Sequence, residues 1–145
     1  MIDSRHGAQI PVIAVIDGQG GGIGSAIIKE LRREFQETME IWALGANATA
    51  TEAMMKARAN RGATGENAIT VSLPKANALV APMAVGWANS MMGEITPGIA
   101  RAVMDNDLLK IFIPLSLERV VLAGYQSEPL PHLVAKAIEI LKSHR

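Results

Sequence analysis

Residues 12–31 read VIAVIDGQGGGIGSAIIKEL, and this stretch decides the fold. The apolar run Ile10–Ile16 ends at Asp17, which is the pattern of a central parallel strand covered on both faces. Five of the next seven residues, Gly18–Gly24, are glycine. From Gly22 onward the apolar residues recur three or four positions apart, which predicts an amphipathic helix. The stretch therefore predicts a strand, a glycine-rich loop and a helix in direct succession.

The remaining chain alternates between strand and helix patterns. Further strands are predicted at Glu40–Leu44, Ala76–Ala81, Lys110–Pro114 and Arg119–Ala123. Further helices are predicted from Thr49 to about Arg58, from Thr96-Pro97 to about Met104, and after Ser127–Pro131. This alternation predicts an α/β, three-layer Rossmann-like domain with about five mostly parallel strands. Asn60–Asn67 is predicted to be a loop, with at most one helical turn at Glu66.

The connection Leu115–Glu118 is too short for a crossover helix. We therefore expect the strand at Arg119–Ala123 either to run antiparallel at an edge or to lie beyond the sheet.

The composition limits the class of protein. We expect one domain over residues 1–145, with residues 1–10 as a flexible N-terminal arm. The formal net charge of zero argues against binding to nucleic acid or to a membrane surface. The chain has no cysteine, which excludes disulfides and thiolate metal sites and favours a cytoplasmic location. The uncharged stretch 76–93 is interpreted as buried or interfacial, because polar residues and a proline interrupt it.

The glycines between Gly18 and Gly24 are typical of a loop that binds phosphate. Gly18, Gly22 and Gly24 fit the pattern GxxxGxG, in which glycines permit the bend, the approach of a phosphate and close helix packing. The N-terminus of the following helix adds free N–H groups. Ser25 and Ala26 stand where a P-loop requires lysine and a hydroxyl residue. The alternative is that the glycines only permit a tight turn and close packing.

A resemblance to known proteins rests on five motifs, VIDGQGGGIG, ALGANA, NRGATGENAI, GEITP and IPL. Together they resemble a bacterial family of short, uncharacterised Rossmann-like proteins, a domain of unknown function. The resemblance covers about residues 12–142 and implies an NAD(P)-type Rossmann-like fold without an established reaction.

The glycine loop alone also resembles the cofactor loop of short-chain dehydrogenases. Those enzymes use a tyrosine and a lysine four residues later, whereas Tyr125 is the only tyrosine here and Pro129 follows it at that spacing. The acidic residue that binds ribose after the second strand is replaced by Gly45, Ala46 and Asn47. Hydride transfer of that type is therefore not expected.

We expect the glycine loop to bind a small phosphate-bearing ligand, either NAD(P)-like or an adenine nucleotide. Asn47 could bind a hydroxyl group, and Arg61 could clamp a phosphate or carboxylate. A solvated arginine or an ion pair between subunits is the alternative for Arg61. The predicted binding residues are Asp17, Gly18, Gln19, Gly20, Gly21, Gly22, Ile23, Gly24, Ser25, Asn47, Arg61, Thr64, Gly65, Glu66, Asn67 and Thr96.

Two carboxylates, Asp17 and Glu94, are the candidates for catalysis. Asp17 could cap loop amides or hold magnesium through water, as in a small phosphohydrolase or transferase. Glu94 follows the uncharged stretch, where desolvation could turn it into a base. Its alternatives are an ion pair with Arg61 or Arg101, or an ordinary place at a helix N-terminus. No metal-ligand cluster or Ser–His–acid set follows from the spacing, so no metal site is predicted.

Met83–Met92, MAVGWANSMM, is the strongest candidate for an interaction surface. We expect a homo-oligomer, most simply a homodimer, through Met83–Glu94. The alternative is that this segment only covers the sheet. The contrasting function is a non-catalytic assembly or regulatory module, in which the glycine loop is structural and Met83–Glu94 is the working surface.

Overall fold

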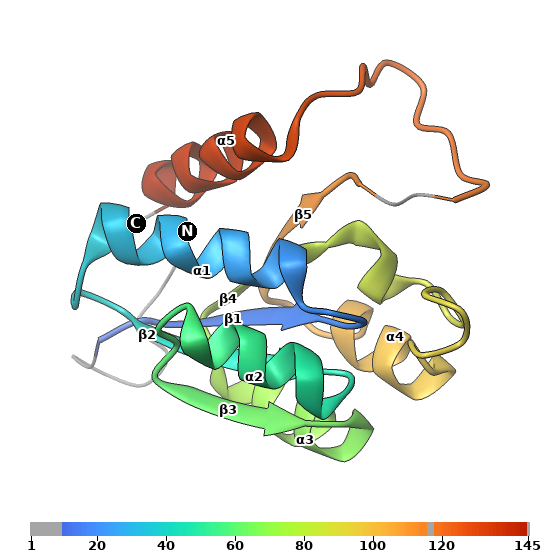
Figure 1. The fold of residues 1–145 in the computed structure, drawn as a ribbon, viewed down its shortest axis with the longest axis horizontal. Helices are drawn as coiled ribbons and strands as arrows, with labels where there is room; N and C mark the ends of the chain where they lie inside the picture. Colours follow the sequence, from blue (N-terminus) through green and yellow to red (C-terminus); the bar gives the residue numbers. More distant parts are fainter. Residues whose placement is uncertain (1–9, 116–117, 145) are drawn as a thin grey trace.

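The computed structural model describes residues 10–115 and 118–144. The expected N-terminal arm lies outside these residues except for Ile10. The described strands are β1 (Val12–Asp17), β2 (Glu40–Gly45), β3 (Arg61–Thr64), β4 (Ala78–Pro82) and β5 (Leu109–Ile113). They form one sheet in the order β3-β2-β1-β4-β5, and every neighbouring pair is parallel (Figure 1). This doubly wound order confirms the predicted Rossmann-like α/β class.

Helices cover both faces of the sheet and complete three layers. One face carries α1 (Gly22–Phe35), α2 (Ala48–Lys56) and α5 (Leu130–Ser143). The other carries α3 (Glu66–Ser72), α4 (Pro97–Met104) and the 3-10 turns η1 (Leu73–Lys75) and η2 (Met83–Gly86). Alternate residues of β1 supply both cores, because Ile13 and Val15 face α1 while Ala14 and Ile16 face the opposite layer.

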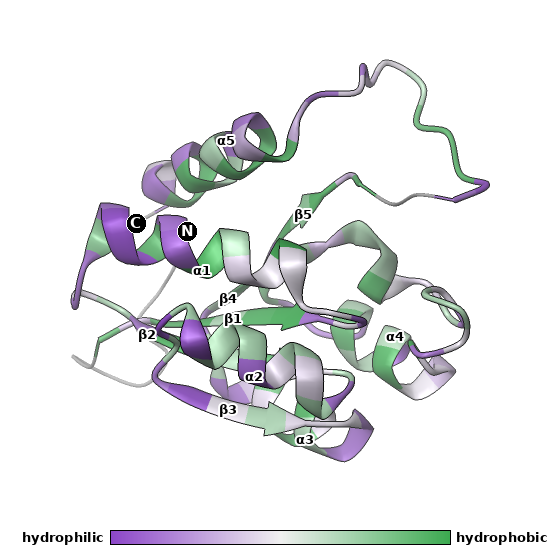
Figure 2. Ribbon diagram, viewed as in Figure 1, coloured by the Kyte–Doolittle hydropathy of each residue, from purple (hydrophilic) through white to green (hydrophobic). Residues whose placement is uncertain are grey.

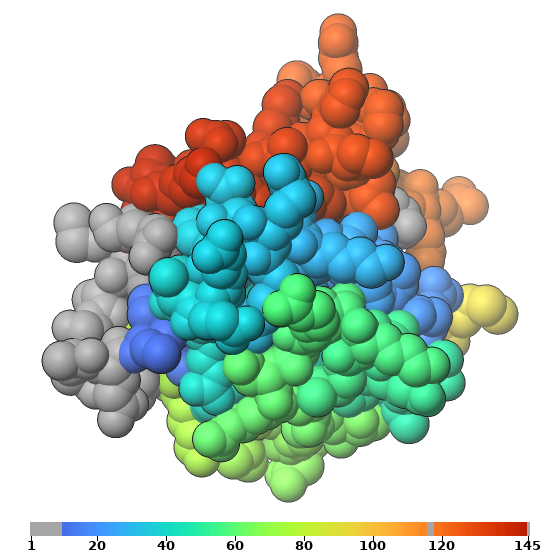
Figure 3. All heavy atoms as spheres, turned by 60° about the vertical axis from the view of Figure 1, so that its left-hand side comes forward, coloured from blue at the N-terminus to red at the C-terminus, as the bar shows by residue number. Residues whose placement is uncertain are grey.

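The buried hydrophobic residues lie between the layers. Figure 2 shows β1 as a hydrophobic strand between helices whose hydrophilic residues lie outward. In Figure 3, α5 lies along α1 on the same side of the molecule, and Lys142 of α5 forms an ion pair with Glu34 of α1. In the described residues, no helix is both long and apolar enough to cross a membrane. The uncharged stretch 76–93 instead contains the buried strand β4 and the turn η2.

Two sequence predictions about strands are wrong. The predicted loop at Asn60–Asn67 contains β3, whose register pairs Trp42 with Arg61 and Gly45 with Thr64. This edge strand is mostly exposed, so it carries no apolar pattern that would reveal it. Conversely, Arg119–Ala123 forms a turn and irregular backbone rather than a strand. Its β-branched residues have no neighbouring strand to pair with, and Val121 is 91% exposed.

The structure corrects the predicted start of α2 and confirms the predicted start of α4. Helix α2 begins one residue before Thr49, and its N-cap is Asn47, whose Oδ1 accepts a hydrogen bond from Ala50 N–H at 2.8 Å. Thr49 is therefore the second residue of the helix and not its start, because Asn47 caps the helix. The predicted cap of α4 is confirmed, since Thr96 Oγ1 accepts from Ile99 N–H at 3.1 Å.

Arg32 joins the ends of several elements beneath the sheet edge. Its side chain is only 6% exposed, and Nε donates to the Arg58 carbonyl at 2.8 Å. The guanidinium also donates to the carbonyls of Gln36 and Met39 and to Asn60 Oδ1. One buried cation thus satisfies acceptors after α1, before β2 and after α2.

We expect Arg32→Ala to lower the free energy of unfolding by about 3 kcal/mol, because several buried acceptors lose their donor at once. Arg33→Ala is the matched control, since Arg33 is 72% exposed and pairs only with Glu30. Urea denaturation of both variants measures the difference. Equal stability of the two variants would contradict the structural role of Arg32.

Candidate functional site

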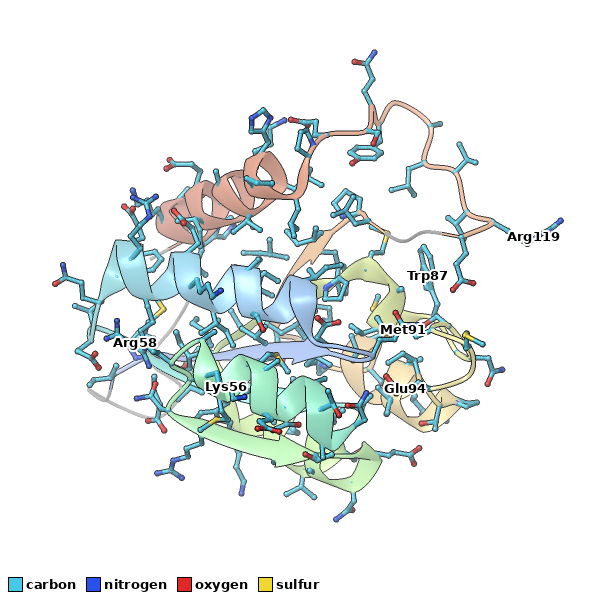
Figure 4. All side chains as sticks on the ribbon, viewed as in Figure 1. Lys56, Arg58, Trp87, Met91, Glu94 and Arg119 are labelled. Carbon is cyan, nitrogen blue, oxygen red and sulfur yellow. The ribbon has the colours of Figure 1, made fainter. Side chains whose placement is uncertain are left out.

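The glycine loop lies where an open α/β sheet binds its ligands. The chain leaves β1 toward β2 on one side, while β4 lies on the other side of β1, so the connections diverge between β1 and β4. Residues 17–23 line a pocket of about 220 Å³ at this position, together with Met91 and Glu118. Met91 and Glu94 follow β4 and lie beside the end of β1 (Figure 4).

Asp17 holds the loop in shape. Its side chain is 3% exposed, and its two oxygens accept hydrogen bonds from Gly18 N–H at 2.8 Å and Gly24 N–H at 2.7 Å. Burial raises the pKa of Asp17, while the backbone N–H groups of Gly24, Gly18 and Ile23 oppose this and the negative charge of Glu94 adds to it. Of the two roles considered for Asp17, the geometry is that of an amide cap. No group of three or more potential metal ligands occurs among the described residues.

Three of the loop glycines are required by the protein's own packing. A Cβ at Gly18 would collide with Glu94 Oε1 and the sulfur of Met91. A Cβ at Gly24 would collide with the Met54 side chain and approach Asp17. Gly21 has a φ of +73°, the left-handed region that favours glycine. These three positions explain the tight turn and the close approach of α1 to α2.

Gly20 and Gly22 have no such explanation. A Cβ at either position would meet no atom within 4 Å, and neither residue has a left-handed φ. Both are exposed and line the pocket. Within the described part of the chain, neither backbone N–H group donates a hydrogen bond to protein. Two bare and unpaired backbone donors therefore face solvent at the N-terminus of α1.

Glu94 lies on the glycine loop and binds its backbone. Glu94 Oε1 accepts a hydrogen bond from Gln19 N–H, and Oε2 accepts from Asn47 Nδ2 at 2.8 Å. Asn47 Nδ2 also donates to the Gln19 carbonyl at 2.9 Å. The expected ion pairs of Glu94 do not form, because Arg61 pairs with Glu40 at 3.0 Å and Arg101 with Asp105 at 3.6 Å. Asn47 thus joins the loop to α2.

The remaining predicted residues are only partly brought together. Thr64 and Gly65 lie at the carboxyl end of β3, where the Thr64 hydroxyl shares a hydrogen bond with Thr51. Thr96 donates to the carboxylate of Glu66, beside the N-terminus of α4. No contact joins Thr64–Asn67 or Thr96 to the glycine loop within the described residues.

Arg61 and Ser25 also differ from the expected arrangement. Arg61 begins β3 and therefore lies at the amino end of the strand, away from the end that carries the glycine loop. It lines a different pocket, with Trp42 and Lys75. The Ser25 hydroxyl is buried in α1 and has no hydrogen-bond partner among the described residues.

The sequence did not identify two pocket residues. Met91 lies in the segment interpreted as an interaction surface, and Glu118 lies between β5 and α5 without a recognisable motif. Within Met83–Glu94, Ala84, Val85 and Met91 pack into the protein's own core, whereas Met92 is 97% exposed. Most apolar side chains of this segment therefore cover the sheet.

The two kinds of glycine should respond differently to one added methyl group. We expect Gly24→Ala to lower the free energy of unfolding by about 2 kcal/mol, because its Cβ overlaps Met54. Gly22→Ala should change it by less than about 0.5 kcal/mol, because its Cβ meets nothing. Urea denaturation measures both. A large loss of stability in Gly22→Ala would mean that Gly22 is structural.

The raised pKa of Asp17 predicts a pH dependence of stability. The folded protein holds this proton more tightly than the unfolded chain, whose pKa is 3.8, so ionisation of Asp17 costs stability as the pH rises from 3.8 through the raised pKa. We expect the free energy of unfolding of wild type, minus that of Asp17→Asn, to fall as the pH rises above 3.8, until Asp17 is ionised in the folded protein as well. A difference that grows with pH would show that the hydrogen bonds outweigh burial.

Comparison with known proteins gives a family. A family model described as a domain of unknown function (DUF3842) matches residues 12–145. No match is found among curated proteins. The crystal structure of a dodecameric FMN-dependent UbiX-like decarboxylase from Escherichia coli O157:H7 aligns at 17% identity and a TM-score of 0.47, covering 91% of this chain and 94% of that one. The family match extends over nearly the whole chain and confirms the resemblance seen in the motifs, so this protein belongs to the DUF3842 family.

Proposed function

We propose that the protein binds a phosphate-bearing small molecule, an NAD(P)-like or adenine nucleotide, at the glycine loop. The observation that carries this proposal is the pair Gly20 and Gly22, which the protein's own packing does not require. A ligand that must approach the backbone closely supplies the missing reason for glycine at these positions.

The chemistry of the pocket supports an anionic group at this point. The free N–H groups of Gly20 and Gly22 lie at the N-terminus of α1, whose partial positive charge favours a phosphate. Asp17 fixes the loop through the N–H groups of Gly18 and Gly24, and it leaves the N–H groups of Gly20 and Gly22 available to a ligand.

The alternatives have less support. A magnesium-dependent hydrolase would need Asp17 to bind the metal, but both oxygens of Asp17 hold loop amides. An assembly module would make the whole glycine loop structural, which leaves Gly20 and Gly22 without a reason. The oligomer through Met83–Glu94 stays a prediction, and Met92 is the residue of that segment most available for it.

A thermal-shift series with NAD⁺, NADP⁺, ATP, ADP and AMP tests the proposal. At about 100 times its Kd, the correct ligand should raise the Tm of wild type by about 6–10 °C. Gly20→Val and Gly22→Val should abolish the shift, because their side chains fill the approach to the N–H groups, while the ligand-free Tm stays within about 2 °C of wild type. Lys29→Ala, an exposed change elsewhere on α1, is the matched control and should keep the full shift.

Two results would reject the proposal. The first is that no nucleotide in the series shifts the Tm of wild type. The second is a shift that persists in both valine variants, because the ligand would then bind away from the loop.

A further inference from the structure

The contact between Glu94 and the glycine loop has the chemistry of an occupied anion site. One carboxylate accepts hydrogen bonds from a loop backbone N–H group, that of Gln19, and from a side-chain amide, that of Asn47. These are the donor types that hold phosphate and carboxylate groups in proteins. They stand directly beside the free N–H groups of Gly20 and Gly22. An internal anion therefore sits next to the place assigned to the ligand's phosphate.

We propose that Glu94 is an internal substitute for the ligand's anionic group and competes with it. In the ligand-free protein, Glu94 holds Gln19 N–H and Asn47 Nδ2. When a phosphate binds, it takes these two donors in addition to those of Gly20 and Gly22, and Glu94 leaves. The proposal rests on the phosphate site of the proposed function and adds how entry to that site is controlled.

The electrostatics of the pocket require such an exchange. A phosphate bound beside Glu94 would face its carboxylate, the buried Asp17 and Glu118 on the pocket wall. No lysine or arginine lines the pocket among the described residues. Repulsion between like charges is strong where water is partly excluded. Departure of Glu94 removes the nearest negative charge and releases two donors in the same movement.

The segment that carries Glu94 has a strained backbone. Asn89, Met91, Met92 and Gly93 all have a positive φ, between 55° and 89°. Left-handed backbone is unfavourable for bulky side chains such as methionine and persists only where surrounding contacts enforce it. The hydrogen bonds of Glu94 to Gln19 and Asn47 are among these contacts. The turn keeps its own backbone hydrogen bonds, among them Asn89 N–H to the Ile95 carbonyl at 2.6 Å, so departure of Glu94 relaxes the strained backbone only locally.

Trp87 stands at the start of this turn and can report its movement. The Trp87 carbonyl accepts a hydrogen bond from Ser90 N–H at 3.2 Å, and the indole packs at the edge of the core beneath α4. The chain has only one other tryptophan, Trp42, which lies in β2. A Trp42→Phe background therefore isolates the emission of Trp87.

The test compares two substitutions that each remove one negative charge beside the glycine loop, at Glu94, which binds Gln19 N–H, and at Glu118, which lines the pocket. Glu94→Gln keeps the size of the side chain but weakens the competition for donors, because its amide has no negative charge and one accepting oxygen in place of two. Glu118→Gln changes a carboxylate that accepts no hydrogen bond from the loop among the described residues. The probes are inorganic phosphate and ADP, titrated by calorimetry. We expect Glu94→Gln to bind both at least tenfold more tightly than wild type, and Glu118→Gln less than threefold more tightly.

Fluorescence gives a second readout that a merely structural role of Glu94 would not change. In the Trp42→Phe background, saturating phosphate should shift the emission of Trp87. With Glu94→Gln added, the ligand-free spectrum should already move toward the phosphate-bound one. Gly22→Val in the same background should show no response to phosphate.

The outcomes separate this inference from the proposed function. If wild type binds phosphate or ADP and Gly22→Val does not, but Glu94→Gln binds no more tightly, the inference fails and the proposed function stands. Equal gains from Glu94→Gln and Glu118→Gln, or an unchanged Trp87 emission at saturation, also overturn the inference. If neither wild type nor Glu94→Gln binds any probe, both proposals fail.

Discussion

The carboxylate of Asp17 is the interaction on which the site depends. It ends β1, and its two oxygens bind the first residue of the loop, Gly18, and the third residue of α1, Gly24. One side chain thereby fixes the distance between the strand and the helix that follows it. Five of the seven residues from Gly18 to Gly24 are glycine, the residue with the greatest conformational freedom, so the loop depends on such contacts for a defined shape. Burial raises the pKa of Asp17, and the backbone N–H groups limit that cost.

The loops after β1, β2 and β4 meet at Glu94 and Asn47. Asn47 caps α2 with its oxygen and uses its nitrogen for Glu94 and the Gln19 carbonyl, so its hydrogen-bonding groups are engaged on both sides. A change in the conformation of one of these loops therefore alters the hydrogen bonds that it makes with the other two. The position of Glu94 in turn depends on a strained turn after β4. Left-handed backbone of this kind also occurs away from the pocket, at Gln36 and Arg58, so the turn after β4 is one of several strained places in the described residues.

The parts of the fold that the sequence predicts are those with long periodic patterns. β1 and α1 follow from an apolar run and an amphipathic one, because most of their buried positions are apolar. β3 could not be predicted, since an exposed edge strand is defined by its pairing with β2 and not by its side chains. Arg119–Ala123 shows the reverse, because β-branched residues form a strand only beside a neighbour. Asn47 was read as a ligand for a hydroxyl, and only the position of Ala50 N–H reveals it as a cap.

The sequence predicted where the candidate site lies, but it did not predict the role of each residue in it. The sequence alone does not distinguish the roles of the five glycines in the loop. The atoms that surround each glycine in the structure do distinguish them. Gly18, Gly21 and Gly24 are required by the fold. A Cβ at Gly18 or Gly24 would collide with neighbouring atoms, and Gly21 has a left-handed φ that favours glycine. Gly20 and Gly22 face open space. If the proposed function is correct, folding and ligand approach depend on different glycines of the same loop. A substitution at one kind of glycine then changes stability, and a substitution at the other changes binding.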